Sequence, residues 1–391
     1  MTVLEMSEYL AKFRRDLRFA VLGAGNGGQA LAGYLAWRGF PVRLYNRSAD
    51  KLEGIRDRGG VELEGRFGGF GRLEAVTSDL GEALQGARVI LVVIPASGHR
   101  DLARALAPHL APGQVVVLNP GRTGGAFEFY RVFRERGVHP AVTVAEAQTF
   151  IFASRVVGPG RARIFEKKRR VPVAALPAGR TRTVVRLMRR ALSEFVPAAH
   201  VLETSLANIG AIFHPAPALM NAARIENGSS FDHYHDGISP AVARVLEAMD
   251  EERLAVARAL GLRLISAREW LRVAYGAVGP DLYTAIASCS AYAGIGAPRE
   301  VNSRYLHEDV PAGLVPLAAL GQLTGVTTPA ISAIVDLASV AVGADFRAAG
   351  RTLERMGLDG MTVNGLWDYV LRGERAPAAR SEEAHSGGGA W

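Results

Sequence analysis

The sequence predicts an α/β fold in which an N-terminal Rossmann-type, doubly wound domain is followed by an all-α C-terminal domain. A glycine-rich turn joins an apolar strand to an apolar helix near the start, and from about Glu203 the pattern becomes helical almost throughout. The chain has 391 residues, 49% of them hydrophobic, which is long for a single core. We therefore expect domains at 1–202 and 203–373, followed by a disordered tail at 374–391.

The glycine turn has the spacing G-x-G-x-x-G. Gly23 allows the tight turn, Gly25 lets the backbone approach a pyrophosphate, and Gly28 lets the following helix pack closely on the strand. A strand precedes the turn, and a helix and a second strand follow it, which is the context that this motif requires. We therefore predict a dinucleotide site that includes Gly23, Gly25, Asn26 and Gly28. The alternative is a glycine turn with a purely structural role.

The end of the second strand bears on the choice of cofactor. An acidic residue there would hydrogen-bond the ribose of NAD, but the sequence has Asn46, Arg47 and Ser48. A guanidinium matches the geometry of a phosphate, so these residues favour NADP over NAD. The alternative is that Arg47 is an ordinary surface arginine in an arginine-rich chain.

Two later apolar runs, 87–95 and 115–118, read as buried parallel strands with a helix between them at 102–110. Ligands of such sheets lie beyond the carboxyl ends of the strands, so we expect Pro95 and Arg122 to face the cofactor. The alternative for Arg122 is an ordinary glycine-rich turn.

A further strand is expected at 141–144, and Glu146 and Gln148 follow it directly. We expect both side chains to line the substrate side of the sheet, with a structural role as the alternative. A helix at 181–195 and a short strand near 200–202 would complete the domain.

The composition narrows the function classes. The net charge of +8 comes mostly from scattered arginines, and the one dense run, 167–170, lacks interleaved aromatic residues. We therefore expect a solvated basic run and anionic small-molecule substrates, with no nucleic acid and no membrane as partners. The N-terminus lacks a secretory pattern, which predicts a cytoplasmic protein. The single cysteine, Cys289, excludes an internal disulfide and is expected to be buried and inert.

Helices are expected in the second domain at 241–261, 266–275, 281–293, 312–324, 328–343 and 345–356. His214 comes earlier in the chain than these helices, in the apolar helical segment 208–215. Pro215 follows it directly and should break that helix at the histidine. Histidine is the side chain best suited to proton transfer near neutral pH, so His214 is the first catalytic candidate. A hydrogen-bonded structural histidine is the alternative.

A polar cluster at 302–309 precedes an apolar helix. Asp309 is either the N-cap of that helix or the carboxylate that orients His214, and Arg304 would then hold a substrate carboxylate. A third cluster, 231–236, contains Tyr234 on the predicted substrate side. Its His233 and His235 have metal-ligand spacing, but no further ligand is suggested, so we predict no metal site and favour a loop at the mouth of a cleft.

Four motifs, taken in chain order, resemble opine dehydrogenases of the octopine/nopaline type. They are the glycine turn, Pro120-Gly121-Arg122-Thr123-Gly124-Gly125, Asn208 through His214-Pro215, and Arg304-Tyr305-x-x-Glu308-Asp309-Val310-Pro311. The resemblance extends from about Arg18 to Val370. It implies that His214 and Asp309 form a catalytic dyad and that Arg304 lies near the substrate. The family often has an acid after the second strand and uses NADH, and Asn46-Arg47-Ser48 departs from this.

The resemblance implies NAD(P)H-dependent reductive condensation of a 2-oxo acid with the amino group of an amino acid. A homodimer is a separate expectation that the resemblance does not carry. Related dehydrogenases that act on hydroxyacids, glycerol phosphate, ketopantoate or phosphogluconate rely on a lysine in or near the helical domain, and this chain has no lysine after Lys168. Two alternatives remain open. One is an NADP-dependent 2-oxo acid reductase, and the other is a catalytically silent NADP-binding sensor.

Overall fold

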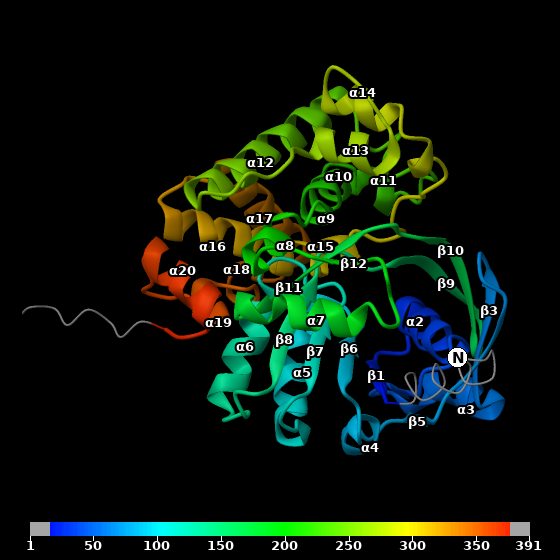
Figure 1. The fold of residues 1–391 in the computed structure, drawn as a ribbon. Coiled ribbons are helices and arrows are strands. Elements are labelled where there is room, and N and C mark those ends of the chain that lie inside the picture. The colour runs from blue at the N-terminus through cyan, green and yellow to red at the C-terminus, as the bar shows by residue number, and fades with distance from the viewer. Residues whose placement is uncertain (1–15, 376–391) are drawn as a thin grey trace, which may run out of the picture.

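The computed structural model describes residues 16–375, and an eight-stranded sheet organises its N-terminal half (Figure 1). All its neighbouring strands are parallel except for the antiparallel pair β8 and β11. In spatial order the strands are β12 (Phe195–Pro197), β11 (Val171–Leu176), β8 (Thr143–Ala147), β7 (Val115–Leu118), β6 (Val89–Val92), β1 (Phe19–Leu22), β2 (Val42–Tyr45) and β5 (Ala75–Thr77).

Helices cover both faces of this sheet because side chains alternate along each strand. One set of alternate residues joins the core under α2, and the other set joins the core under α5 and α6. The helices of this half are α2 (Asn26–Trp37), α3 (Glu53–Arg58), α4 (Leu80–Leu84), α5 (His99–Leu106), α6 (Gly125–Glu135) and α7 (Thr181–Met188).

A second sheet of four strands packs on the far side of α2, so that this helix lies between the two sheets (Figure 1). Its strands, in spatial order, are β4 (Gly69–Arg72), β3 (Gly60–Gly65), β10 (Arg161–Lys167) and β9 (Phe152–Gly158). Strands β3 and β4 are not among the elements expected from the sequence.

The C-terminal half is helical, which confirms the predicted fold class, and it lies over one end of the sheet (Figure 1). Its helices are α8 (Val201–Leu206), α9 (Gly210–Phe213), α10 (Pro215–Met220), α11 (Ala222–Glu226), α12 (Pro240–Ala259), α13 (Ala267–Tyr275), α14 (Leu282–Ala287), α15 (Arg304–His307), α16 (Val315–Thr324), α17 (Pro329–Val342), α18 (Phe346–Ala349), α19 (Leu353–Met356) and α20 (Val363–Arg372).

The predicted strand near 200–202 is wrong. The last strand of the sheet is β12, five residues earlier in the chain, and helix α8 occupies the predicted position. The side chain of His200 caps α8 by accepting a hydrogen bond from the backbone N–H of Glu203, and a local cap of this kind starts a helix. The proposed tail lies outside the described residues apart from its first two positions.

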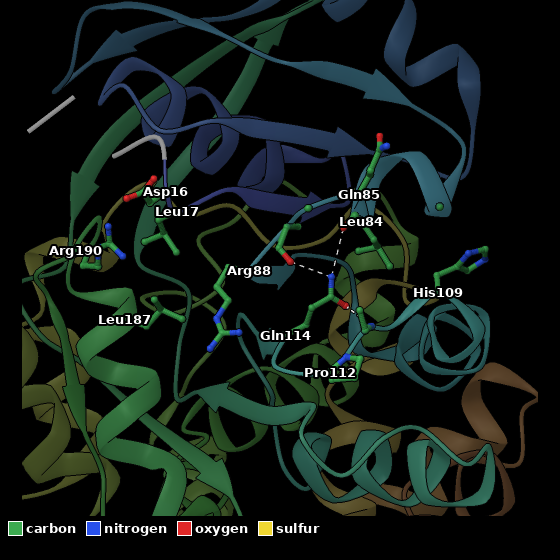
Figure 2. A pocket seen from close by; sticks show the side chains of 14 residues that line it. Asp16, Leu17, Leu84, Gln85, Arg88, His109, Pro112, Gln114, Leu187 and Arg190 are labelled. Atoms are coloured by element: carbon green, nitrogen blue, oxygen red, sulfur yellow. Dashed lines mark hydrogen bonds between the residues drawn. The ribbon is translucent and has the colours of Figure 1, made fainter. Parts of the chain in front are cut away.

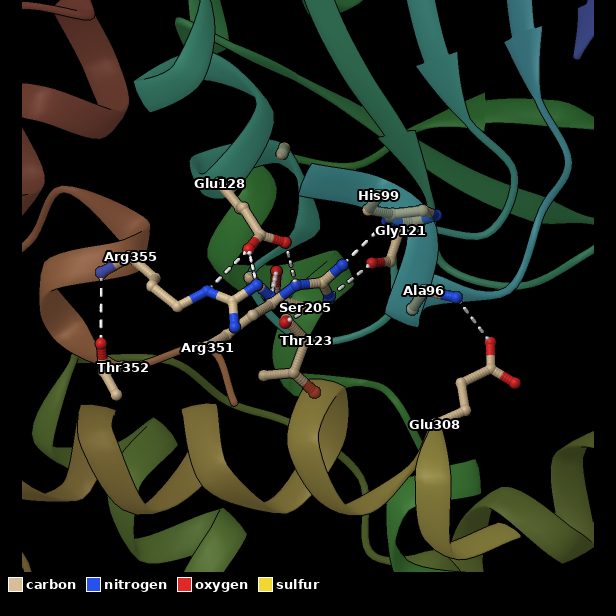
Figure 3. Close-up of polar contacts among 12 residues, drawn as sticks. Ala96, His99, Gly121, Thr123, Glu128, Ser205, Glu308, Arg351, Thr352 and Arg355 are labelled. Carbon is tan, nitrogen blue, oxygen red and sulfur yellow. Dashed lines mark hydrogen bonds and ion pairs between the residues drawn. The ribbon is translucent and has the colours of Figure 1, made fainter. Parts of the chain in front are cut away.

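A buried arginine joins the two halves (Figure 3). The Arg351 side chain is 2% exposed and pairs at 2.8 Å with the carboxylate of Glu128, on α6. Its guanidinium also donates to the backbone carbonyls of Gly121 and Thr123 and to Nδ1 of His99. Burial, then the charge of Arg351, lowers the pKa of His99, so this ring is a neutral acceptor. The turn after β7 is therefore held by a side chain of the helical half.

A cavity of about 740 Å³ lies at the amino ends of the strands (Figure 2). Arg88 and Gln114, which line it, directly precede β6 and β7, and Leu17, which also lines it, lies two residues before β1. Ligands of open α/β sheets bind at the opposite, carboxyl edge, so this cavity is separate from the predicted site.

No single helix of the described residues is long and apolar enough to span a membrane. One bent pair of helices, Pro329–Val342 with Phe346–Met356, meets the criterion by length and composition alone.

The glycine turn offers a matched pair of substitutions. A Cβ atom at Gly28 would lie 1.7 Å from the carbonyl oxygen of Gly23, whereas at Gly25 nothing lies within 4 Å and the backbone φ of −78° suits any residue. We expect Gly28→Ala to lower the free energy of unfolding by about 1–3 kcal/mol, measured by urea denaturation. Gly25→Ala should change it by less than about 0.5 kcal/mol but weaken NAD(P)H binding in a fluorescence titration. Equal losses of stability would contradict this assignment.

The contacts of Arg351 between the two halves should contribute strongly to the free energy of unfolding. We expect Arg351→Leu to cost about 3–5 kcal/mol of unfolding free energy, because it leaves a buried carboxylate short of one cation and two backbone carbonyls without a donor. The control is Arg372→Leu, since that arginine is 74% exposed and its ion pair within the described residues is with Asp368 alone. The control should cost no more than about 0.5 kcal/mol in the same denaturation experiment.

Candidate active site

The structure brings His214 and Asp309 together although 95 residues separate them in the chain. Nδ1 of His214 lies 2.8 Å from Oδ2 of Asp309. The carboxylate is fully buried, whereas the imidazole is 17% exposed. A carboxylate at Nδ1 fixes the tautomer of a histidine and leaves Nε2 as the nitrogen that can exchange a proton with a ligand.

His214 stands at the junction of two short helices, as the following proline predicts. Helix α9 ends at Phe213 and α10 begins at Pro215. The backbone of His214 nevertheless keeps helical angles, with φ −101° and ψ −52°, so Pro215 interrupts the helix without forcing the histidine into an extended conformation. The break turns the imidazole toward the neighbouring π-helical turn.

Asp309 precedes that turn, Val310–Leu314, a single π-helical segment of the kind found at functional sites. Its side chain makes no cap hydrogen bond, so the N-cap alternative does not describe its contacts. Burial alone would raise the pKa of Asp309, but the charges of Arg122 and His214 lower it below the usual range. Asp309 therefore stays ionised next to the imidazole.

Arg122 pairs with acids of the helical half, a contact that sequence reasoning did not predict. Its guanidinium lies 3.2 Å from Oδ1 of Asp309 and 3.2 Å from Oε2 of Glu308. Burial alone would lower the pKa of Arg122, but these two carboxylates raise it. The predicted cofactor contact of Arg122 stays a prediction, while the structure shows it holding the aspartate that faces His214.

Glu308 is the acid that sequence reasoning missed, and it ties three segments together. One oxygen accepts a hydrogen bond from the backbone N–H of Ala96, beyond the carboxyl end of β6 (Figure 3). Its other oxygen pairs with Arg304 at 3.0 Å, one helical turn earlier. In the sequence, Glu308 belongs to the motif Arg304-Tyr305-x-x-Glu308-Asp309, and its i, i+4 spacing from Arg304 favours an ion pair.

Arg304 is the cation of this group that faces solvent, because its side chain is 63% exposed. The neighbouring Tyr305 stacks on the ring of His214, with centroids 4.6 Å apart and an interplanar angle of 17°. One short helix, α15, therefore brings an exposed cation and an aromatic wall next to the dyad. Such an arrangement suits a small anionic substrate.

The two histidines of the cluster 231–236 contact backbone carbonyls. Nε2 of His233 lies 3.3 Å from the carbonyl oxygen of Phe213, and Nε2 of His235 lies 3.2 Å from that of Cys289, so the two rings bind different carbonyls. The described residues contain no group of three or more potential metal ligands. Burial, then the charge of His214, lowers the pKa of His233 to about 4, which makes it a neutral wall of the site.

Two of the predicted substrate contacts are buried. Tyr234 is 6% exposed and stacks on Tyr292 at a centroid distance of 3.9 Å. Glu146 has no exposed surface, and its carboxylate accepts hydrogen bonds from the hydroxyls of Thr204 and Ser205 and from the N–H of Ala126. Burial raises the pKa of Glu146. Both side chains are already occupied by protein contacts, and we leave them out of the proposed substrate contacts.

Gln148 remains half-buried, and its amide donates to the carbonyl of Ala207, in the segment that leads to His214. Free Cys289 is 1% exposed, in agreement with a packed thiol.

The predicted cofactor residues gather around the glycine turn. Oδ1 of Asn46 accepts from the N–H of Ala24, and its amide donates to the carbonyl of Ser48, so Asn46 shapes the end of β2. Arg47 is exposed, and within 16–375 no hydrogen bond or ion pair engages its side chain. Asn26, at the start of α2, is exposed and accepts from the N–H of Val156. Pro95 is exposed beyond β6.

The residues present fit a dinucleotide. Open space surrounds Gly25 at the N-terminus of α2, where a pyrophosphate is expected. Asn119 is 1% exposed at the carboxyl end of β7, and neither polar atom of its side chain has a hydrogen-bond partner among residues 16–375. A buried amide of this kind is satisfied when a ligand supplies both a donor and an acceptor.

The comparisons with known proteins agree with this geometry. Residues 197–342 match the family model of the NAD/NADP octopine/nopaline dehydrogenase α-helical domain, and residues 18–120 match that of the NAD-dependent glycerol-3-phosphate dehydrogenase N-terminus. An opine dehydrogenase of Arthrobacter sp. (strain 1C) is 42% identical over 353 residues, covering 90% of this chain and 98% of that protein. The octopine dehydrogenase of Pecten maximus is 25% identical, covering 85% and 92%.

A solved structure of octopine dehydrogenase with NADH and L-arginine has the same fold. It superimposes with a TM-score of 0.76 at 23% identity and covers 92% of this chain and 99% of its own. An NADP⁺-bound yersinopine dehydrogenase superimposes with a TM-score of 0.68 at 17% identity, covering 92% and 98%. The chain therefore belongs to the opine dehydrogenase family of NAD(P)-dependent oxidoreductases.

Proposed function

We propose that this enzyme joins a 2-oxo acid such as pyruvate to the amino group of an amino acid, and reduces the resulting imine with NAD(P)H. One hydride and one proton are added, one water leaves, and the product is an N-(carboxyalkyl) amino acid. The observation that carries the proposal is the His214–Asp309 pair beside the exposed cation Arg304. Imine formation and reduction need a proton shuttle and a carboxylate anchor in one place.

Each of the three residues has a distinct role. His214 gives a proton to the departing hydroxyl and accepts one from the amine, through the ring nitrogen that does not face Asp309. Asp309 fixes the tautomer and stabilises the imidazolium, and Arg122 keeps Asp309 ionised and in position. Arg304 holds a substrate carboxylate. The bound dinucleotide supplies the hydride.

NADP is the cofactor that we propose this chain prefers. The exposed and unengaged Arg47 at the end of β2 supports this, because a guanidinium there can bind the 2′-phosphate. Ser48 stands beside it with no side-chain cap hydrogen bond, so its hydroxyl is available to the same phosphate. Both NADH-bound and NADP⁺-bound structures exist among the structural neighbours, which supports binding of either cofactor by this fold.

Substrates of this chemical class are bound by the neighbours. Octopine dehydrogenase has been solved with NADH and L-arginine, with NADH and agmatine, and with NADH and pyruvate. A cytoplasmic location and a homodimer are part of the proposal and rest on the sequence. So does the domain boundary near residue 202, which the helical-domain family model supports by starting at residue 197.

The oxidation of NADPH should depend on an amine. We expect pyruvate alone to give little turnover and pyruvate with a suitable amino acid to give rapid turnover, with a higher kcat/KM for NADPH than for NADH. The measurement is the loss of absorbance of the reduced nicotinamide with a panel of amino acids and each cofactor.

Two results of that assay would overturn the proposal. Rapid oxidation with pyruvate alone would make the enzyme a 2-oxo acid reductase. Tight NADPH binding without turnover of any oxo acid and amino acid pair would support the silent sensor. A higher kcat/KM for NADH would leave the reaction intact and refute only the cofactor preference.

His214→Ala should lower kcat by about 10²- to 10⁴-fold, because it removes the proton shuttle. NADPH affinity should stay within about twofold, since the glycine turn belongs to the other half of the molecule. His109→Ala is the control: that histidine is exposed beside the amino-end cavity and should leave kcat unchanged. A kcat for His214→Ala close to wild type would refute the assigned role.

A further inference from the structure

The basic run 167–170 is not the uniformly solvated run that its sequence predicts. Nζ of Lys167 pairs with Glu194 at 2.7 Å and also donates to the hydroxyl of Tyr34. Lys168 is half-buried, and its Nζ lies 2.5 Å from Oγ1 of Thr149. The two neighbouring lysines therefore have different environments, and only Lys167 has a carboxylate partner.

The fold places Lys168 at the edge of the sheet where ligands are expected. Thr149 follows β8, and Lys168 precedes β11, which runs antiparallel to β8. The loop that leaves β8 and the loop that enters β11 therefore meet at the carboxyl edge, and the N–H of Lys168 bonds to the carbonyl of Ile151 there. Gln148, next to Thr149, is bonded to the segment that leads to His214.

Lys168 carries a charge without a counter-ion. In the part of the chain that the structure describes, no carboxylate lies within ion-pair distance of Nζ, and its polar contact is a neutral hydroxyl. Burial, then the charge of Arg122, lowers the pKa of Lys168 from 10.5 to about 8. Arg122 itself is already paired with Glu308 and Asp309. A half-buried cation in this position is stabilised by a bound anion.

The reaction supplies such an anion. The condensation product carries two carboxylates, one from the 2-oxo acid and one from the amino acid. Arg304 stands beside Asp309 and His214 and is placed to hold the carboxylate next to the carbonyl carbon under attack. The second carboxylate then requires a second cation, and Arg122 is engaged by two acids.

We propose that Lys168, positioned by Thr149, binds the α-carboxylate of the amino acid substrate. The inference rests on the proposed function and adds a substrate-binding residue to it. The other lysine of the pair, Lys167, serves the packing of β10 against its neighbours and takes no part in binding.

The test compares the wild type with three single variants: Lys168→Gln, Lys168→Arg and the control Lys167→Gln. The amine substrate is the amino acid with the highest kcat/KM in the panel, and the probe is the amine that lacks its carboxylate; for L-arginine this amine is agmatine. Lys168→Gln should raise KM for the amino acid about 10- to 100-fold, with kcat within about threefold and NADPH affinity unchanged. KM for the carboxylate-free amine should be the same in wild type and Lys168→Gln.

The pH dependence supplies a second readout. A pKa near 8 means that Lys168 is charged below pH 8 and loses its proton above it, so KM of the wild type for the amino acid should rise with pH through that value. Lys168→Arg, whose cation does not titrate in this range, should show no such rise. Thermal unfolding of each variant checks that it is folded.

Several results would overturn the inference. They are an unchanged KM in Lys168→Gln, an equal rise for the amino acid and for the carboxylate-free amine, a change confined to the 2-oxo acid or to NADPH, or an equal effect of Lys167→Gln. The wild type reports on the proposed function separately. If it oxidises NADPH without any amine, the proposed function fails and the inference fails with it.

Discussion

The buried ion pairs of Arg122 with Glu308 and Asp309 are the interaction on which the site depends. Arg122 belongs to the turn after β7, and both acids belong to the helical half. Separating the halves would leave three charges short of their partners, so docking of the domains holds Asp309 ionised and in place beside His214. Arg122 has a positive φ of 61°, which a buried turn tolerates only when its surroundings hold it.

Two prolines help to hold that turn. Pro316 has no N–H for the carbonyl of Ala312, and this carbonyl accepts instead from the N–H of Thr123, in the turn after β7. The carbonyl of Pro311 likewise accepts from the N–H of Arg351, whose guanidinium binds the same turn. Two backbone carbonyls of the π-helical segment therefore accept hydrogen bonds from other parts of the chain, whereas in an ordinary helix they would accept from N–H groups of the same helix. The segment that contains Pro311 and Pro316 thus contributes hydrogen bonds to the contact between the domains.

Local features were predictable, and contacts between distant segments were not. The glycine turn, the apolar strands and the helix break at Pro215 follow from neighbouring residues, and the fold class follows from their order. The pairing of His214 with Asp309 was one of two alternatives that the residues left open, and the family resemblance favoured it, since no periodicity links positions 95 residues apart. The acid contacts of Arg122, the burial of Glu146 under α8, and strands β3 and β4 depend on long-range packing, which leaves no periodic signal in the chain.

Lys168 lies outside the helical half in the sequence but close to the candidate site in space. The chain has no lysine after residue 168, yet the antiparallel direction of β11 places Lys168, which precedes that strand, at the carboxyl edge. The two half-buried cations there differ in their partners. Arg122 is neutralised by acids and fixes the aspartate, whereas Lys168 has only a hydroxyl and keeps its charge for a ligand. The ion pairs that each cation makes with protein carboxylates, more than its residue type, therefore decide its role: the paired Arg122 supports the dyad, and Lys168, unpaired among the described residues, binds the substrate.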